Sequence, residues 1–346
     1  MEVTVHKQRL SLNWEVINLL SRLDRFDASW STLERTEGQT LKQLKTMATV
    51  RSVGASTRIE GSKMTDEEVA QLLGQIATSK LEDRDAQEVV GYFDALDLIS
   101  EAHDTMSMTA NTIKNLHNVL MKHSQHDQWH KGEYKQLSNV VQAQFPDGTT
   151  RVIFETTPPG FATEDAMNSL MDWYTTDTET HPLVKAALLS YEFVSIHPFQ
   201  DDNGRLSRLL ATLALLQSGY KWIEYVSLEH EIEARKTEYY QVLRTCQAQR
   251  PNENVNAWIL FFFRALAKVQ DLLMQKLEES GRTKSLAPRE KAMLAYIGNH
   301  PGCKSGEIAE QLGIPNPTVK RLLAQLVQEQ LLVRHGRGPG TNYTIG

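Results

Sequence analysis

A polar stretch at residues 279–288, ESGRTKSLAP, divides the chain into two parts with different patterns. From about residue 10 to residue 280, apolar residues recur at helical spacings of three and four, and few segments alternate as strands do. The residues that follow have a pattern of their own. Because Gly281 and Pro288 both disfavour a continuous helix, the sequence predicts a helical body, a break after Gly281 and a small second domain.

The composition is that of an ordinary globular protein. Of the 346 residues, 40% are hydrophobic and 23% are charged, which excludes a disulfide-stapled miniprotein, a fibre and a wholly disordered chain. The net charge is −6, but residues 283–346 contain eight Lys and Arg against four Asp and Glu, so this tail is +4 and the remainder is −10. The charge asymmetry supports the separate second domain.

The two cysteines and the N-terminus indicate the compartment. Cys246 and Cys303 lie far apart, without a zinc or redox spacing, and are interpreted as reduced, buried thiols. The N-terminal residues have no signal-peptide pattern, and no run of eighteen apolar residues occurs. We expect a cytoplasmic protein without a membrane segment. The sequence does not define the oligomeric state, which leaves a homodimer open.

The body is predicted to be mostly α, with one β-hairpin. The hairpin is expected between Gly132 and Pro159, where Asp147-Gly148 separates two β-prone runs and is typical of a type I′ turn. Thr65 and Glu68 form a capping box, and Gly219 is expected to end a helix. The predicted helices span residues 10–23, 40–59, 66–78, 84–102, 109–121, 163–175, 182–196, 204–218, 229–247 and 253–280.

The tail has the element order of a winged helix-turn-helix. Residues 288–300, 305–313 and 317–330 read as three short helices, and residues 331–345 as two strands around a glycine-rich turn. Such domains bind DNA, but they also serve as dimerisation or protein-docking modules. If this one binds DNA, the candidate phosphate contacts are two residues of the third helix and two of the wing, namely Lys320, Arg321, Arg334 and Arg337.

Residues 197–208, HPFQDDNGRLSR, carry the chemistry of the body. Leucines at helical spacing place a helix start near Asn203 or Gly204, where free backbone N–H groups and the helix dipole favour an anion. Arg205 and Arg208 share the first turn, where two cations are unfavourable unless an anion compensates. Asp201 is a hard oxygen donor suited to magnesium. His197 is expected to end the preceding helix and to act as a general base.

This block resembles the Fic motif, His-x-Phe-x-Asp/Glu-Gly-Asn-Gly-Arg-x-x-Arg, at seven of eight specified positions. Asp202 stands where the family has a glycine, and aspartate tolerates a left-handed backbone better than most residues. The resemblance implies protein adenylylation, in which AMP passes from ATP to a hydroxyl side chain of a target protein or of the chain itself. It implies that His197 is the base, that Asp201 holds Mg²⁺, and that the nucleotide is bound by Asp202, Asn203, Gly204, Arg205, Leu206, Ser207 and Arg208.

The resemblance extends beyond the motif. Residues 56–61, STRIEG, resemble the family's inhibitory sequence, which implies that Ser56 and Glu60 lie on one helical face and that Glu60 pairs with Arg208. Residues 132–135 and the hairpin resemble the target-docking flap, with Lys135 where arginine is commoner. Tyr239 and Tyr240 resemble a pair near the adenine, although core packing is an equally good interpretation. Four histidines that lack a zinc-site spacing are interpreted as a polar loop, namely His117, His123, His126 and His130.

We therefore expect an N-terminal helical region at 1–110 with an inhibitory helix at about 41–60, a Fic core at 111–281 and a winged helix at 285–346. Two alternatives stay open. One is a nucleotide-sensing DNA-binding regulator with weak or no transfer, in which Asp202 in place of the glycine would indicate lost catalysis. The other is a hydrolase that removes AMP, in which Glu60 positions water. The sequence does not name the target or tell whether Ser, Thr or Tyr is modified.

Overall fold

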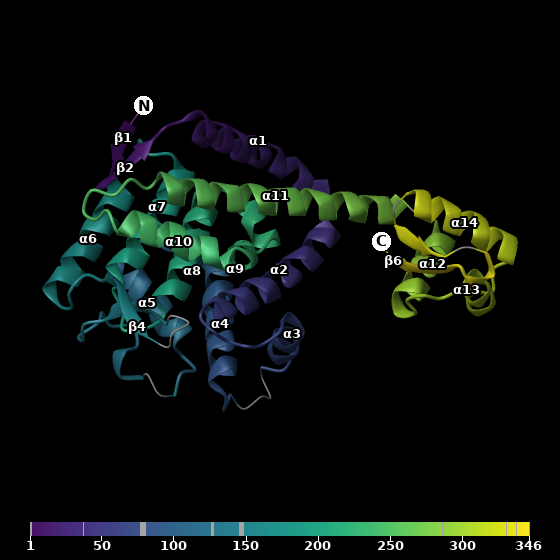
Figure 1. Ribbon diagram of the computed structural model, residues 1–346, viewed down its shortest axis with the longest axis horizontal. Coiled ribbons are helices and arrows are strands. Elements are labelled where there is room, and N and C mark those ends of the chain that lie inside the picture. The colour runs from purple at the N-terminus through teal and green to yellow at the C-terminus, as the bar shows by residue number, and fades with distance from the viewer. Residues whose placement is uncertain are drawn as a thin grey trace. The chain divides into compact units, whose positions relative to one another are not determined.

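The computed structural model describes residues 2–36, 38–76, 81–125, 128–144, 149–285, 287–329, 331–336 and 338–345. The chain forms two compact units, Met1–Met274 and Gln275–Gly346 (Figure 1). Among the described residues there are fourteen α-helices and three antiparallel sheets of two strands each. The predicted mostly-α fold class is confirmed. The division of the body near residue 110 stays a prediction.

The first unit is mainly helical, and residues 121–160, between its fifth and sixth helices, contain a β-hairpin. Its helices are α1 (Trp14–Thr36), α2 (Gly38–Ile59), α3 (Asp66–Gly74), α4 (Arg84–Ala102), α5 (Ala110–Leu120), α6 (Phe161–Thr176), α7 (Pro182–Ile196), α8 (Asn203–Gln217), α9 (Leu228–Ala234), α10 (Lys236–Gln247) and α11 (Asn256–Ser285), with short 3₁₀ turns η1 (Gln128–His130) and η2 (Lys221–Tyr225). The last part of α11, from Gln275, belongs to the second unit.

Helices α7 and α8 form the centre of this unit. They pack against each other, and almost every side chain in both is buried. A helix that is apolar all round is stable only inside a protein, which explains why α7 and α8 carry so many Leu and Ala residues. Helices α2 and α4 also pack on α8. The loop between α7 and α8 is therefore held by the best-packed part of the unit.

Local signals predicted several helix ends correctly. Thr65 caps α3 in a capping box with Glu68, as expected. Helix α8 ends where Gly219 adopts a φ of 93°, a left-handed value that favours glycine. The Gly219 and Tyr220 N–H groups donate to the carbonyls of Leu216 and Leu215. These bonds satisfy carbonyl groups that would otherwise have no partner at the helix end.

Several predicted boundaries were wrong, among them the end of the helix expected at 66–78, since α3 ends at Gly74. The first helix begins at Trp14 and continues to Thr36. The helix expected at 229–247 is interrupted at Arg235, which separates α9 from α10. The break expected after Gly281 lies further on, because α11 continues to Ser285. One glycine inside a helix costs only about 1 kcal/mol relative to alanine, and Pro288 instead begins the next helix.

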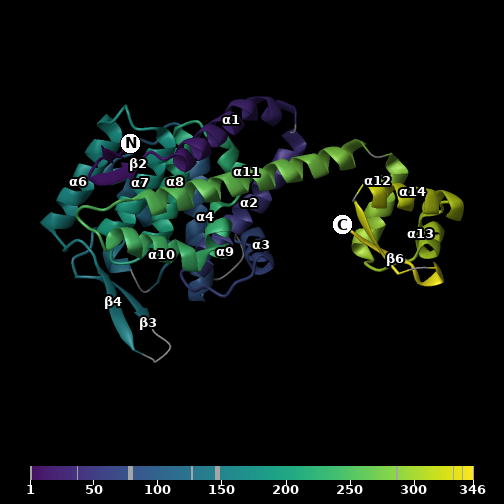
Figure 2. The same cartoon turned by 45° about the horizontal axis from the view of Figure 1, so that its top comes forward.

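The predicted hairpin is present as β3 (Val140–Gln144) and β4 (Thr150–Glu155), which pair antiparallel with a bulge between Val141 and Gln142. Figure 2 shows it standing out from the helices. The Asp147-Gly148 turn lies outside the described residues.

A second hairpin, which the sequence analysis did not predict, consists of β1 (Glu2–Val5) and β2 (Gln8–Ser11). Arg9 of β2 donates its backbone N–H to Glu253 O (2.8 Å) and accepts from Val255 N–H (2.9 Å). These bonds tie the hairpin to the segment that precedes α11.

The second unit has the predicted winged-helix order. Its elements are α12 (Pro288–Asn299), α13 (Ser305–Leu312), α14 (Asn316–Gln328), β5 (Leu332–His335), the turn η3 (Gly338–Gly340) and β6 (Asn342–Ile345). Apolar side chains from all three helices and both strands form one core, including Met293, Ile308, Leu323, Leu332 and Tyr343.

Both cysteines are buried and unpaired, as expected. Across the part of the chain that the structure describes, none of the helices is long and apolar enough to span a bilayer.

Candidate functional site

The site is built on the loop between α7 and α8. Helix α7 ends at Ile196, and the next residue, His197, has a φ of 56° that turns the chain out of the helix before Pro198. The loop is closed by Asn203, whose amide oxygen accepts from Phe199 N–H and whose amide nitrogen donates to Phe199 O, both at 2.9 Å. Helix α8 then begins at Asn203, where the sequence predicted its start. Two rigid helices and one side-chain amide thus fix the backbone of the loop.

The surroundings of His197 fix which of its ring nitrogens carries the proton. Its Nδ1 lies 3.2 Å from Val194 O, and since a carbonyl only accepts, the proton of the neutral ring is on Nδ1. Nε2 therefore carries the free lone pair. Burial lowers the pKa of His197 below its usual value, and the nearby charge of Lys135 acts in the same direction, while the bond to Val194 O opposes both. The imidazole is consequently neutral at neutral pH, which the predicted role as a base requires.

Asp201 and Asp202 have different surroundings although they are neighbours. The Asp201 side chain is 50% exposed, and its Oδ2 lies 3.6 Å from Arg84. Its Oδ1 accepts from the backbone N–H of Asp202 (2.8 Å). The Asp202 side chain is only 6% exposed. Its backbone adopts a φ of 64°, so the left-handed turn expected of the family's glycine is retained with an aspartate in its place.

Asp202 forms an ion pair with Arg205. Burial raises the pKa of Asp202 to about 6, opposed by the charge of Arg205 and reinforced by Asp201, Glu88 and Glu60. Arg205 also lies 2.9 Å from Glu88 of α4. Arg205, one of the two arginines expected to bind phosphate, is thus contacted by two carboxylates.

A small cavity borders this cluster, with a volume of about 160 Å³ and a lining that includes Glu88, Asp202 and Arg205. The ion-paired side chains of Asp202 and Arg205 therefore border a cavity whose lining includes further charged side chains, such as Arg84.

Arg208 is bound from the other side by helix α2. It is almost fully buried, and its Nε donates to Ser56 Oγ (2.8 Å) and its Nη2 to Ser56 O (2.9 Å). Nη2 also makes an ion pair with Glu60 Oε1 at 2.9 Å. The expected ion pair between Glu60 and Arg208 is therefore present, and Ser56 contacts the same guanidinium. The negative charge of Glu60 raises the pKa of Arg208, against the effect of burial.

The Glu60 carboxylate lies at the start of α8. A β-carbon placed on Gly204 would overlap Glu60 Oε1, so the carboxylate sits directly over the backbone of the first turn, where the helix dipole favours an anion. Only glycine allows this close approach. Glu60 itself follows the last residue of α2, the unfavourable end of a helix for a carboxylate, and Arg208 supplies the cation that compensates.

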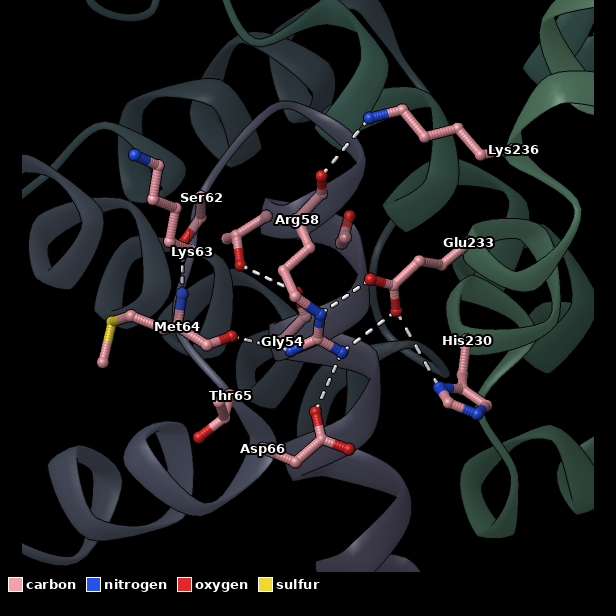
Figure 3. Close-up of polar contacts among 12 residues, drawn as sticks. Gly54, Arg58, Ser62, Lys63, Met64, Thr65, Asp66, His230, Glu233 and Lys236 are labelled. Atoms are coloured by element: carbon pink, nitrogen blue, oxygen red, sulfur yellow. Dashed lines mark hydrogen bonds and ion pairs between the residues drawn. The ribbon is translucent and has the colours of Figure 1, made fainter.

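The end of α2 is attached to α9 by Arg58 (Figure 3). Arg58 Nε and Nη2 donate to the two carboxylate oxygens of Glu233 at 2.7 and 3.0 Å. Nη2 also donates to Asp66 (2.9 Å) and Nη1 to Met64 O (2.9 Å). A β-carbon on Gly54 would come within 2.6 Å of Arg58 Nη1, so this glycine makes room for the guanidinium. Arg58 thus fixes the segment that carries Ser56 and Glu60.

The two tyrosines of α10 are placed differently. Tyr239 is buried, with its ring centroid 5.8 Å from that of Trp258. Burial raises its pKa, and the charge of Arg208 opposes this. Tyr240 contacts Tyr239 edge-on and lines a surface pocket of about 550 Å³ with Lys236 and Arg244. Tyr239 therefore belongs to the aromatic core beside Arg208, whereas Tyr240 reaches open space. Their roles with a nucleotide stay predictions.

Leu206 and Ser207 have buried side chains. The Leu206 N–H donates to Asp202 O (2.9 Å) and Ser207 Oγ to Gly204 O (2.9 Å). Both residues thus complete the first turns of α8 from within. Their predicted contact with a nucleotide remains a prediction.

The interpretation of the four histidines as a polar loop was wrong for His117 and His130, which are buried. His117 stacks on Phe199 of the loop, with ring centroids 3.9 Å apart, and its Nδ1 accepts from Gly132 N–H (2.9 Å). Burial lowers the pKa of His117 to about 3. His123 lies 2.9 Å from Asp94, and His126 lies outside the described residues. The described residues contain no cluster of three metal-ligating side chains.

In the second unit, Lys320 and Arg321 are exposed on α14, and Arg334 is exposed on β5. Lys320 and Arg334 line one groove with Lys304 and Glu307. Arg337 lies outside the described residues. Three of the four predicted DNA-contacting side chains are thus accessible, and two of them share a groove between the third helix and the wing. Their role stays a prediction.

Comparison with known families agrees with these two units. A model of the Fic/DOC family matches residues 107–215, and a model of the MarR family matches residues 285–340. The chain contains a Fic domain. The second unit is a MarR-like winged helix domain. The match to the Fic domain includes the hairpin and the whole loop at 197–208, whereas Glu60 precedes it.

Curated relatives of the chain are named protein adenylyltransferase Fic. The protein of Drosophila willistoni is 28% identical over 205 residues, which cover 58% of this chain and 38% of the fly protein. That of Drosophila mojavensis is 27% identical over 227 residues, which cover 63% of this chain and 42% of the relative. The chain therefore spans about two fifths of the length of the curated relatives it matches.

Solved structures show the same fold. A Fic family protein from Desulfovibrio desulfuricans G20 has a TM-score of 0.63 at 23% identity, with 97% of both chains covered. A Fic domain containing signaling protein from Bacteroides thetaiotaomicron has a TM-score of 0.60 at 22% identity, with 75% of this chain and 97% of the other covered. Fic-1 (aa134 - 508) of C. elegans has a TM-score of 0.54 at 22% identity, covering 78% of this chain and 73% of that one.

Proposed function

We propose that the Fic domain is a protein adenylyltransferase that transfers AMP from ATP to a hydroxyl side chain of a target protein or of the chain itself. The observation that carries the proposal is the position of Glu60. Its carboxylate lies over the first turn of α8 and is bound by Arg208, so this turn already holds an anion. A phosphate group would meet the same backbone and the same arginine there.

The reaction needs a base beside the phosphate site. The target hydroxyl oxygen attacks the α-phosphorus of ATP, the bond to the β-phosphate oxygen breaks, and pyrophosphate leaves. His197 Nε2, which has the free lone pair, takes the hydroxyl proton. The first-turn N–H groups of α8, at Asn203 and Gly204, stabilise the charge on the α-phosphate. Such transfer depends mainly on positioning and charge neutralisation, and the closed loop supplies both.

The residues present fit a magnesium ion. Mg²⁺ requires only one or two protein carboxylates when phosphates complete its shell, and Asp201 is a half-exposed carboxylate next to the phosphate site. Asp201 would hold the ion, which neutralises phosphate charge when bound. Arg208 and Arg205 would hold the outer phosphates of ATP. Tyr240, at the surface pocket beside Tyr239, is the better placed of the two for contact with the adenine.

The same arrangement supports autoinhibition. While Glu60 occupies Arg208, the arginine is not free to bind the terminal phosphate of ATP, and ATP then lacks the contact that would align it for in-line attack. We include this inhibition in the proposal.

The decisive experiment is mass spectrometry of the full chain after incubation with ATP and magnesium, comparing wild type with Glu60→Gly. Addition of AMP, greater in Glu60→Gly, is the expected result. No addition in either protein, with or without a lysate as a source of targets, would overturn the proposal.

A second candidate is a nucleotide-sensing DNA-binding regulator that transfers nothing. The ion pair between Asp202 and Arg205 favours it, because Arg205 is then not free to bind phosphate. The MarR-like domain would bind the DNA. Nucleotide-dependent DNA binding by a chain that never gains AMP would identify this function. Removal of AMP, with Glu60 positioning water, would appear as loss of AMP from a modified protein.

A further inference from the structure

Lys135 is a buried lysine that contacts three neutral oxygen atoms. Its side chain is among the largest that are fully buried, with 1% exposure. The ammonium donates to Asn139 Oδ1 (2.9 Å), to Thr156 Oγ1 (2.8 Å) and to Ile196 O (3.3 Å). An ammonium group has three N–H donors, so each finds one acceptor. The ion pairs recorded among the described residues do not include Lys135.

The three acceptors belong to three different parts of the site. Asn139 directly precedes β3, and Thr156 directly follows β4, so one ammonium contacts both ends of the hairpin. Ile196 is the last residue of α7, next to His197. Thr156 Oγ1 lies within hydrogen-bond distance of both Asn139 O (2.7 Å) and Asn139 Oδ1 (2.6 Å). The two strands are thereby joined at their base and attached to the helix that carries the catalytic histidine.

Two further hydrogen bonds attach the same segment to the loop. The backbone N–H of Lys135 donates to Pro198 O (2.8 Å). Asn139 Nδ2 donates to Phe199 O (2.9 Å), the carbonyl that also accepts from Asn203. Asn139 at the base of the hairpin and Asn203 of the loop therefore donate to the same carbonyl, that of Phe199. A displacement of the hairpin base would disturb the loop at 197–208.

A charged group here is costly. Burial lowers the pKa of Lys135 to about 8, because a charge loses its hydration in the interior. A methionine would fill the same volume without that cost, although it would leave the acceptors without a donor. Buried polar groups are retained in some proteins because they specify one geometry among several. The arrangement around Lys135 fits that explanation, since its three partners come from separate segments.

We propose that Lys135 is a positioning residue that fixes hairpin β3–β4 relative to His197, so that an extended target segment along the hairpin presents its hydroxyl to Nε2. An added strand is held mainly by main-chain hydrogen bonds, so the register and tilt of the hairpin set where the target hydroxyl lies. This inference rests on the proposed transferase function. It assigns Lys135 to the target side of the reaction and not to the nucleotide.

The test compares Lys135→Met with Lys114→Met in the full-length Glu60→Gly protein. Lys114 is the matched control, because its ammonium contacts Glu133 (3.1 Å) in the same segment but is partly exposed. We measure hydrogen–deuterium exchange of the amides in residues 140–144 and 150–155, the dissociation constant for ATP, and the rate of self-modification by mass spectrometry. Lys135→Arg serves as the conservative variant.

Lys135→Met is expected to raise exchange in both strands about ten-fold, to slow self-modification about ten-fold and to leave the ATP dissociation constant within about three-fold, whereas Lys114→Met changes none of these. Lys135→Arg is expected to restore part of the protection. Unchanged exchange in the strands of folded Lys135→Met would overturn the proposal, as would an equal rise throughout the body.

If Lys135→Met does not fold, Thr156→Val removes one acceptor and the bridge between the strands, and the same measurements apply. The exchange measurement does not depend on activity. If no protein in the series gains AMP, the transferase function fails while exchange still decides whether Lys135 fixes the hairpin. If AMP transfer is robust but insensitive to Lys135→Met, the positioning role fails while the transferase function stands.

Discussion

Asp202 and Arg205 form an ion pair at the start of α8. A second ion pair, between Glu60 and Arg208, lies about one helical turn further along α8. The two arginines expected to bind phosphate are thus each paired with a carboxylate of the same chain. Arg205 is contacted in addition by Glu88. Relief of one ion pair leaves the other in place, so the two carboxylates are expected to weaken nucleotide binding separately.

Asp202→Asn should strengthen ATP binding. Asparagine keeps the size of the side chain and tolerates the φ of 64° at this position, while it removes the charge that pairs with Arg205. We expect a gain in affinity of about ten-fold, which corresponds to about 1.4 kcal/mol, by calorimetry with ATP and magnesium. Asp202→Gly should act in the same direction. A loss of affinity in Asp202→Asn would show that the carboxylate has a role of its own, for example in holding the metal.

Glu60→Gly should accelerate transfer, and the gain should require Arg208. Removal of the carboxylate frees Arg208 for the terminal phosphate, so self-modification should rise at least about ten-fold. In a double-mutant cycle with Arg208→Ala, the gain should disappear. Independent effects of the two substitutions would mean that the contact between Glu60 and Arg208 does not control transfer.

Arg58→Met should release part of the inhibition although Glu60 is still present. Arg58 fixes the end of α2 to Glu233, and without it the segment with Ser56 and Glu60 can leave Arg208 more often. Because this ion pair is partly exposed, we expect only about a five-fold rise in self-modification. Arg22→Met, which removes an ion pair with Asp271 on α1 and α11, is the matched control. Equal rates in both variants would contradict the role of Arg58.

His197→Ala should abolish transfer and leave ATP binding within about three-fold, because in the proposed mechanism the imidazole acts on the incoming hydroxyl. The pKa of His197 is lowered from its usual value, so Nε2 stays unprotonated at neutral pH. The transfer rate of Glu60→Gly should therefore be level through neutral pH and fall only on the acid side of about pH 6.5, the usual histidine value. A rate that instead rises steadily above neutral pH would point to another base.

The second unit should bind duplex DNA with an affinity that falls steeply with salt. Lys320, Arg321 and Arg334 are exposed cations, and each phosphate contact that is lost should reduce the slope of log affinity against log salt by about one. The triple change of these residues to Ala is compared with the full-length wild type by fluorescence anisotropy across a salt series. No binding to any duplex, or a flat salt dependence, would favour a docking role.

The parts of the site that follow from local sequence could be predicted. Pro198 stops one helix, and leucine spacing after Gly204 begins the next, so the loop was located from neighbours in the chain. Ser56 and Glu60 share a helical face because they are four residues apart, and the motif resemblance named Arg208 as the partner of Glu60. Each of these inferences used a short segment or a known motif.

Contacts between distant segments could not be predicted. Nothing in the sequence near Glu88 indicates that it contacts Arg205, since α4 meets α8 only in the folded unit. His117 looked like one of several polar histidines, yet it stacks on Phe199. The β1–β2 hairpin was missed because its strands have four residues each and are held by the segment around Glu253. The residue type alone does not tell whether a charged side chain is exposed to solvent or buried in the core.

Glu60 and Arg208 belong to one covalent chain, and this sets how their contact can be relieved. Both groups are held by the same folded unit, so dilution of the protein does not separate the pair. The fraction of molecules in which the contact is closed is the same at every protein concentration, unlike that of an inhibitor bound from solution. A competing anion shifts it according to the concentration of the anion relative to its own dissociation constant, and so does an event that moves the end of α2.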